Sequence, residues 1–280
     1  MSVYKKFTIF FLSVILLSLL ISLLIYNLQM FAYHKNPETQ LKPFHFSKIL
    51  SRTTTVVLFI SLIWFRKKID KKSIQSLGLE NFSINNHQLW IGFLAGILSL
   101  SLVVVVKIFF GVSTLAPKTW ELFDLIKCLY FLGAVFCIAF VEELFFRGYL
   151  LQSWIGDLGE KKAAVYTSLF FSLTHFIRPI SDPMIFVSEF IGLFLVGYIL
   201  SLAWIYTRKL YLSIGIHAGW VYVVKMQPYF VDSIPHDNHL VFGGERLVSG
   251  GISWMFMILF VWFLKLSYDK TLENKNINLV

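Results

Sequence analysis

The sequence predicts an all-α polytopic membrane protein with about eight transmembrane helices. Hydrophobic residues make up 57% of the 280 residues, and charged residues make up only 15%. The mean hydropathy is +0.70, which is far above that of ordinary soluble domains. Aromatic residues make up 18% of the chain, which also indicates a membrane protein, because aromatic rings are common where helices meet the lipid interface. We therefore expect the bilayer to surround most of the chain.

Eight apolar runs come close to the roughly 20 residues that a helix needs to cross about 30 Å of hydrocarbon. They cover residues 7–27, 49–65, 89–112, 125–151, 162–178, 184–206, 210–226 and 251–267. The second run is weakened by Arg52 and a Thr-rich start, and the fifth is short and contains Ser, Thr and His. The first run is longer than a signal-peptide core and is followed by no small-residue cleavage site, so we predict a retained span.

Basic residues gather in alternate loops between the apolar runs. The clusters are Lys5 and Lys6, then Arg66, Lys67, Lys68, Lys71 and Lys72, then Lys161 and Lys162, then Arg208 and Lys209, and finally Lys265 and Lys270. With eight spans these clusters share one side of the membrane, which predicts that both termini are cytoplasmic. The net charge of +9 therefore reports topology, and we expect no nucleic-acid partner.

Three ionisable residues stand at the end of the fourth apolar run. A charge at the bilayer centre costs about 2.5 to 3.5 kcal/mol, so such residues usually have a partner or a function. Glu143 and Arg147 are four residues apart on one helix face, which predicts an ion pair. Glu142 points about 100° away from its neighbour, so its carboxylate is free to act elsewhere, and an apolar cavity would make it a stronger base. The alternative is a purely structural ion-pair cluster.

Two further spans each carry one histidine. His175 follows Phe171 by four residues on the fifth predicted helix, and His217 lies in SIGIHAGW on the seventh. The small residues Gly215 and Gly219 predict that another helix packs closely beside His217. Taken singly, each histidine is more typical of a hydrogen-bonded core residue than of a metal ligand or a base.

The three groups lie at comparable depths. At 1.5 Å per residue, Glu142, His175 and His217 are about 13, 18 and 10 Å from the cytoplasmic ends of their helices. Two imidazoles and one carboxylate can bind zinc with an open position for water, or they can activate water directly. The sequence thus predicts that the three side chains converge.

Three motifs carry a resemblance to a known family. EELFFR (Glu142 to Arg147), FSLTH (Phe171 to His175) and the His217 motif resemble the EExxxR, FxxxH and HxxxN motifs of the CPBP family of intramembrane proteases. That family includes the CAAX prenyl endopeptidases and the bacterial Abi proteins linked to bacteriocin processing and immunity. The resemblance divides the chain into N-terminal helices with a cytoplasmic basic loop (1–119), a catalytic core (120–227), and an outer loop with the last helix (228–280).

The resemblance implies an endopeptidase in a bacterial plasma membrane that cleaves a hydrophobic peptide or a membrane protein. Glu142 and His175 would activate water, Glu143 and Arg147 would hold the site together, and His217 would help to stabilise the oxyanion. If the reaction uses a metal, Glu142, His175 and His217 would be the ligands of a zinc ion.

One position departs from the family pattern. Val221 stands where the family often has Asn, and losing an oxyanion donor costs about 10² to 10³ in rate. Either another donor such as Trp220 replaces it, or the activity is weak or absent. The alternative function is therefore a catalytically silent membrane scaffold or a bacteriocin-immunity protein. A proton relay through Glu189 is a third reading, but the sequence lacks the two related halves of such transporters, and we predict an interfacial Glu189.

Overall fold

The computed structural model describes residues 3–35, 43–116, 119, 121–176, 182–244 and 246–277, with the side chains of residues 5–269 within those ranges. The side chain of Lys270 and residues 177–178 of the fifth predicted helix lie outside the described part. The chain forms two compact units, Met1–Ser76 and Leu77–Val280. The predicted division at 119/120 and 227/228 stays a prediction.

The first unit is a pair of antiparallel helices. They are α1 (Val3–Lys35) and α2 (Phe46–Lys68). The rings of Phe10 and Phe65 meet edge to face with their centroids 5.2 Å apart, and at the other end Tyr26 and Phe46 meet at 5.8 Å. Both helices continue beyond the predicted apolar limits, because residues at the polar membrane interface can extend a helix.

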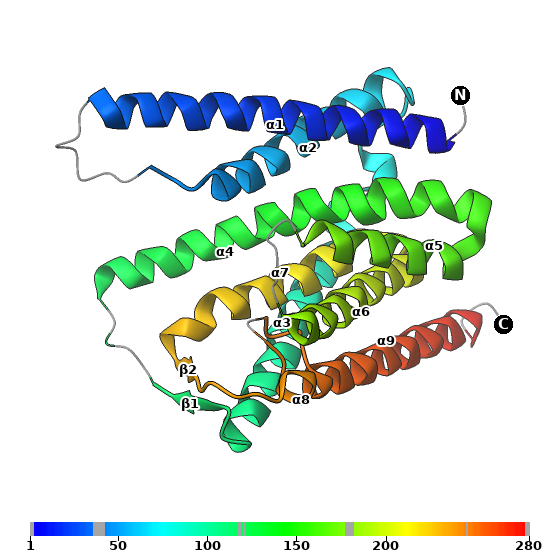
Figure 1. Cartoon of the computed structure of the whole chain (residues 1–280). Coiled ribbons are helices and arrows are strands. Elements are labelled where there is room, and N and C mark those ends of the chain that lie inside the picture. The colour runs from blue at the N-terminus through cyan, green and yellow to red at the C-terminus, as the bar shows by residue number, and fades with distance from the viewer. Residues whose placement is uncertain are drawn as a thin grey trace. The chain divides into compact units, whose positions relative to one another are not determined.

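The second unit holds the remaining elements. In chain order they are α3 (Phe82–Phe109), β1 (Ser113–Leu115), α4 (Leu122–Glu143), the π-helix η2 (Leu144–Leu151), α5 (Gln152–Thr174), α6 (Pro183–Thr207), α7 (Tyr211–Met226), η3 (Gln227–Tyr229), β2 (Val231–Ser233), α8 (His239–Phe242) and α9 (Gly251–Ile277), and the short η1 (Gln75–Leu77) lies at the junction of the units. The all-α expectation is confirmed, and each predicted run corresponds to one long helix (Figure 1).

Six segments of the described chain are long and apolar enough to cross a membrane, and the protein is an integral membrane protein. The number is below eight for two reasons. Residues 122–174 count as one segment, although the chain turns inside it at Gly159, whose φ and ψ angles are not helical. Helix α7 has only 16 residues, which is short for a span.

The passage from α4 into α5 differs from the prediction of two helices joined by a loop. Residues 144–151 form a π-helix, and all eight of its residues are buried. The chain then enters α5 directly and turns at Gly159, whose φ of 74° is readily adopted only by glycine. The bend at Gly159 therefore replaces the expected loop, and π-helical turns of this kind often occur at functional sites.

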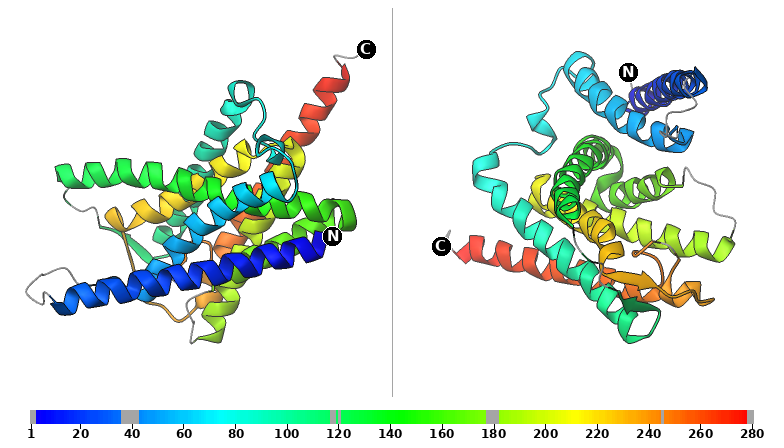
Figure 2. Two further views of the ribbon diagram at one scale, coloured as in Figure 1. Left: turned by 90° about the horizontal axis from the view of Figure 1, so that it is seen from above. Right: turned by 90° about the vertical axis from the view of Figure 1, so that its left-hand side faces the viewer.

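A two-stranded antiparallel sheet was not predicted from the sequence. Strands β1 and β2 pair with Ser113 opposite Ser233 and Leu115 opposite Val231, and they lie beyond the ends of α3 and α7 (Figures 1 and 2). Each strand has three residues, which is too short to show an alternating pattern in sequence.

Helices α3 and α7 approach each other through glycines on both sides. A β-carbon at Gly215 would lie 2.1 Å from the carbonyl oxygen of Leu89, and one at Gly219 would lie 2.4 Å from that of Phe93. On α3, Gly96 meets the carbonyl oxygen of Ile216 in the same way at 2.5 Å. The predicted close packing at Gly215 and Gly219 is confirmed, and it fixes the helix that carries His217.

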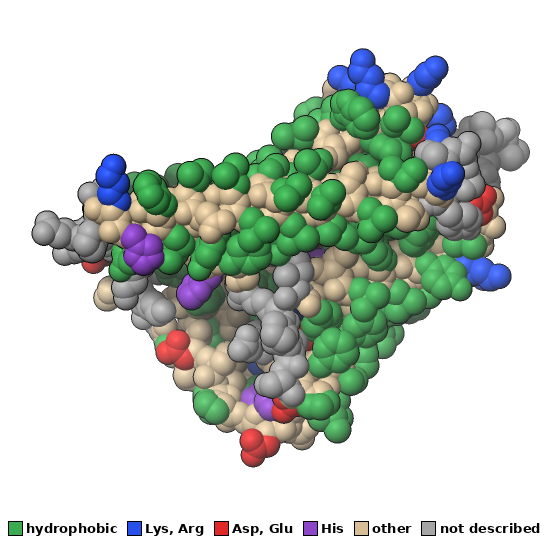
Figure 3. Space-filling view, turned by 45° about the horizontal axis from the view of Figure 1, so that its top comes forward, with side chains coloured by type: hydrophobic (Ala, Val, Ile, Leu, Met, Phe, Trp, Pro, Cys, Tyr) green, Lys and Arg blue, Asp and Glu red, His purple; other side chains and the backbone are tan. Residues whose placement is uncertain are grey.

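The outer surface of the helices is mostly apolar. Large hydrophobic side chains are exposed along the helices, for example Leu98 at 69% and Leu129 at 71%. Figure 3 shows apolar side chains over most of the face that it presents, with Lys and Arg toward the edges. Such a surface is stable only against lipid.

Candidate active site

Glu143 and Arg147 form the ion pair that their spacing predicts. Arg147 Nη1 donates to Glu143 Oε1 at 2.8 Å, and both side chains are completely buried. The second terminal nitrogen of Arg147 donates to the carbonyl oxygen of Gly197 on α6 at 2.9 Å, and the guanidinium lies 4.8 Å from the centre of the Phe171 ring. The pair therefore ties η2 to α6 and to α5 at the centre of the second unit.

His217 is oriented by the same glutamate. Its Nδ1 lies 2.8 Å from Glu143 Oε1, and the residue is 5% exposed. A carboxylate accepts hydrogen bonds, so we place the proton of the neutral ring on Nδ1, which leaves a lone pair on Nε2. Glu143 thus sets both the direction and the tautomer of His217.

His175 is held by its own helix. Its Nδ1 lies 2.8 Å from the carbonyl oxygen of Phe171, which can only accept, so Nδ1 is the donor and Nε2 is left free. The residue caps α5 just after Thr174, whereas the sequence placed it inside a helix running to 178. The helix thus ends a few residues earlier than predicted. It ends where the ring of His175 bonds back to the carbonyl oxygen of Phe171, one turn earlier in the helix.

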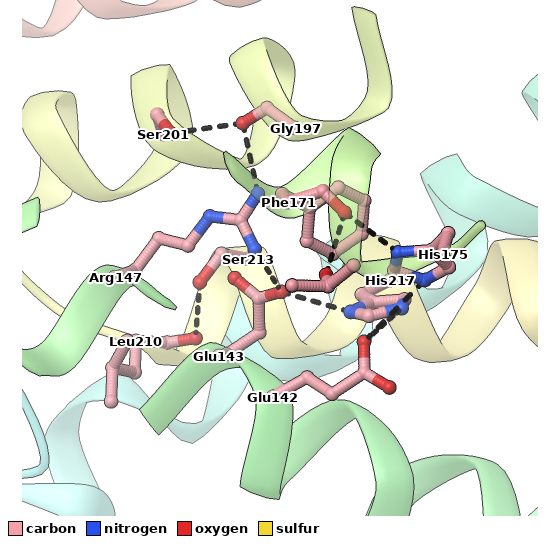
Figure 4. Close-up of polar contacts among 11 residues, drawn as sticks. Glu142, Glu143, Arg147, Phe171, His175, Gly197, Ser201, Leu210, Ser213 and His217 are labelled. Atoms are coloured by element: carbon pink, nitrogen blue, oxygen red, sulfur yellow. Dashed lines mark hydrogen bonds and ion pairs between the residues drawn. The ribbon is translucent and has the colours of Figure 1, made fainter. Parts of the chain in front are cut away.

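Glu142 faces the two free imidazole nitrogens. Its Oε2 lies 3.8 Å from His217 Nε2 and 4.0 Å from His175 Nε2 (Figure 4). Oε2 is buried and has no hydrogen-bond partner among the residues that the structure describes, although the side chain as a whole is 23% exposed. Both gaps exceed a direct hydrogen bond, and a water molecule can bridge gaps of this size. The structure thus brings together the three predicted groups.

The same donors are of the types that zinc accepts. Ligands held about 2.0 to 2.2 Å from a tetrahedral ion are roughly 3.3 to 3.6 Å from one another. The gaps of 3.8 and 4.0 Å are wider. In the described ranges, no group of three or more His, Cys, Asp or Glu is arranged to hold a metal ion. In this arrangement the side chains are slightly too far apart to ligate one ion directly, and zinc binding stays a prediction.

Trp220 does not replace the missing donor at Val221. Its indole N–H donates to the hydroxyl of Ser99 on α3 at 2.9 Å, and its ring packs 5.8 Å from that of Phe260 on α9. The suggested substitution of Trp220 for an oxyanion donor is therefore wrong. Ser99 belongs to a different helix, so the sequence could not reveal this contact.

Two residues near the site make contacts that sequence reasoning missed. Arg246 donates from Nη2 to the carbonyl oxygen of His175 at 3.0 Å, and nothing in the sequence indicated this contact. Glu189 is only 3% exposed and accepts a hydrogen bond from Arg246 Nε at 2.7 Å, and its predicted interfacial depth stays a prediction. One general rule could have indicated the pair: an acidic residue within a membrane span usually needs a partner.

The chain was compared with family models, curated proteins and solved structures. Neither a curated protein nor a solved structure matched the chain. Residues 124–223 match the family model described as type II CAAX prenyl endopeptidase Rce1-like, and the five predicted site residues all lie within this range. The match confirms that the segment carrying the site resembles the CAAX protease family that the three motifs predicted.

Proposed function

We propose that this protein is an intramembrane endopeptidase in which Glu142 is the general base. The observation that supports the proposal best is the buried Oε2 of Glu142, which faces two imidazole Nε2 atoms and has no hydrogen-bond partner in the described chain. The Rce1-like match supports a CAAX-type intramembrane endopeptidase in general. The roles of the individual residues are our inference from the geometry.

The first step is attack by water. A water molecule between Glu142 Oε2 and His175 Nε2 donates to both, which leaves its oxygen lone pairs free and lets one of them attack the scissile carbonyl carbon. As the new C–O bond forms, Glu142 takes the proton and the carbonyl oxygen becomes an oxyanion. Glu142 then gives this proton to the leaving amine as the C–N bond breaks, which yields a carboxylic acid and an amine.

His217 is the proposed oxyanion donor. Its Nδ1 proton is held by Glu143 at 2.8 Å, so Nε2 can donate only when the ring carries a second proton. In that form His217 is a cation, and its charge as well as its N–H would stabilise the developing negative oxygen. Glu143 and Arg147 keep the ring in place and do not touch the substrate.

The substrate must reach a site inside apolar helices. The helices around Glu142 expose hydrophobic side chains, including Leu129 and Tyr130 on α4 and Leu173 on α5. A substrate that approaches past such surfaces has to partition into lipid. We therefore propose a hydrophobic peptide or a membrane protein as the substrate.

The test compares membrane peptides from cells that express the wild type or Glu142→Ala. The proposal expects a precursor that accumulates only in the Glu142→Ala cells. Glu160→Ala is the matched control, because Glu160 is a partly exposed glutamate that pairs with Arg208 away from the site. If no precursor accumulates while both variants are expressed and folded, the protease proposal fails.

A catalytically silent membrane partner is the competing function, and Val221 favours it because valine offers no oxyanion donor. In that case the phenotype of a deletion strain would be restored by Glu142→Ala as well as by the wild type. The protease proposal expects restoration by the wild type and by Glu160→Ala only.

A further inference from the structure

A second Glu–Arg pair, formed by Glu189 and Arg246, lies next to His175. Arg246 Nε donates to Glu189 Oε2 at 2.7 Å, and its Nη2 donates to the carbonyl oxygen of His175 at 3.0 Å. Arg147 is used in the same way, with one nitrogen on Glu143 and another on the carbonyl oxygen of Gly197. Each arginine thus divides its donors between a buried carboxylate and a backbone carbonyl.

The carbonyl that Arg246 contacts lies at the C-terminal end of α5. His175 is the C-cap of α5, where the last carbonyl groups of a helix lack partners within the helix and carry partial negative charge. A guanidinium there satisfies the carbonyl and complements the helix dipole. The His175 ring is bonded to the Phe171 carbonyl one turn back, so movement of this cap would move the ring.

Glu189 holds the side chain of Arg246 in place. The glutamate is on α6, it is 3% exposed, and a buried carboxylate demands a compensating cation. The guanidinium also lies 5.8 Å from the centre of the Phe176 ring. Arg246 is therefore fixed from α6 on one side and bonds to the cap of α5 on the other.

The segment that carries Arg246 is itself seated tightly. The carbonyl oxygen of Val248 would lie 2.1 Å from a β-carbon at Gly192, so the loop backbone touches α6 directly. The amide of Ser249 donates to the carbonyl oxygen of Arg246 at 3.0 Å, and the hydroxyl of Ser249 accepts from the amide of Gly244 at 2.8 Å. These contacts hold residues 246–249 against α6, and so they help to keep the side chain of Arg246 in place.

We infer that Arg246, backed by Glu189, is a positioning residue that locks the cap of α5 and so holds His175 Nε2 toward Glu142. We call the contact from Arg246 to the carbonyl oxygen of His175 the clamp. Its effect on catalysis rests on the proposed function, whereas its effect on the position of His175 can be tested without it. Arg246 lies outside the matched range of 124–223. The family motifs therefore do not assign it.

The test records histidine nitrogen NMR signals from the full-length protein in detergent, with His175→Gln used to assign the His175 signal. The wild-type ring should show protonated Nδ1 and bare Nε2. In Arg246→Gln we expect the signal to move toward the mixture of tautomers found in a free histidine. Arg208→Gln is the control, because it removes another Arg–Glu pair far from His175. An unchanged His175 signal in folded Arg246→Gln would overturn the inference.

Two further measurements separate a positioning role from a loss of folding. Arg246→Lys keeps the charge beside Glu189 but cannot make both contacts in the same geometry, so it should fold and still shift the His175 signal. On the precursor found with Glu142→Ala, kcat should fall on the order of 10- to 100-fold in Arg246→Lys with KM nearly unchanged.

The outcomes for the two proposals are distinct. If the His175 signal moves in the Arg246 variants but no precursor is cleaved by any protein, the clamp stands and the protease proposal fails. If Glu142→Ala abolishes cleavage while the Arg246 variants change neither cleavage nor the His175 signal, the clamp is wrong and the protease proposal stands.

Discussion

Glu142 and Glu143 are neighbours in the chain with opposite surroundings. Glu143 Oε1 takes hydrogen bonds from Arg147 and His217, whereas the buried oxygen of Glu142 has no such partner in the described chain. One carboxylate is therefore neutralised and structural, and the other is available to accept a proton. Adjacent residues on a helix diverge by about 100°, which makes this division possible.

Removing the charge of Glu143 should destabilise the fold. Glu143→Gln leaves Arg147 as an uncompensated charge in a completely buried site, and breaking a buried pair costs about 3 to 5 kcal/mol. Denaturant unfolding in detergent should show this loss, and the double variant Glu143→Leu, Arg147→Leu should recover part of it. Equal stability of Glu143→Gln and the wild type would contradict the structural role.

Restoring a donor at position 221 should raise activity. Val221 follows His217 by one helical turn on the same face of α7, so an amide there would lie near the proposed oxyanion. Val221→Asn should increase kcat by about 10-fold or more, since a single oxyanion donor is worth up to about 10² to 10³. A kcat no higher than that of the wild type would show that the oxyanion lies elsewhere.

The convergence of the ionisable residues was easier to predict from the sequence than the backbone contacts that hold them in place. Acids and histidines stand out in apolar helices, and the spacing of four residues predicts the Glu143–Arg147 bond directly. The carbonyl of Gly197 and the contact from Arg246 to His175 could not be predicted, because backbone carbonyls leave no mark in a sequence and 71 residues separate Arg246 from His175.

At the scale of elements, the crossing of α3 and α7 decides where His217 lies. The carbonyl oxygen of Leu89 is against Gly215, and that of Phe93 is against Gly219, so the two backbones are in direct contact. Small residues in membrane helices serve this purpose. The sequence showed the glycines of α7, but it did not show which helix would meet them.

Adding a single methyl group at this crossing should separate the helices. Gly215→Ala would place a β-carbon 2.1 Å from the Leu89 oxygen, and overpacking of this kind costs about 1 to 3 kcal/mol. Gly133→Ala on α4 is the control, because a β-carbon there meets no described atom within 4 Å. Thermal unfolding in detergent should show a lower Tm for Gly215→Ala only, and equal effects of both substitutions would contradict the account.

At the scale of the whole molecule, the second unit has its basic loops at one end and its two-stranded sheet at the other. Arg208 pairs with Glu160, and Lys209 pairs with Glu80 at 2.7 Å, so the bend at Gly159 and the turn before α7 lie at one end. The sheet of β1 and β2 lies beyond the opposite ends of α3 and α7 (Figure 1). The eight apolar runs were predictable, whereas the short strands and the π-helix between α4 and α5 depend on contacts that periodicity does not report.

This arrangement predicts the sidedness of the membrane protein. In a chain whose Cys128 and Cys137 are replaced by Ala, Asp232→Cys on β2 should react with a membrane-impermeant maleimide added to intact cells. Lys161→Cys should react only after the membrane is opened, because basic loops stay in the cytoplasm. Labelling of both cysteines from outside would contradict cytoplasmic termini.

The most direct test of the central claim uses the purified protein in liposomes with the precursor that accumulates in Glu142→Ala cells. The wild type should cleave it, and Glu142→Gln should lose at least about 100-fold in kcat, because general base catalysis contributes about 10² to 10⁴. The thermal unfolding of Glu142→Gln should match that of the wild type, since Glu142 Oε2 has no hydrogen bond to lose within the described chain. Cleavage by folded Glu142→Gln at the wild-type rate would contradict the account.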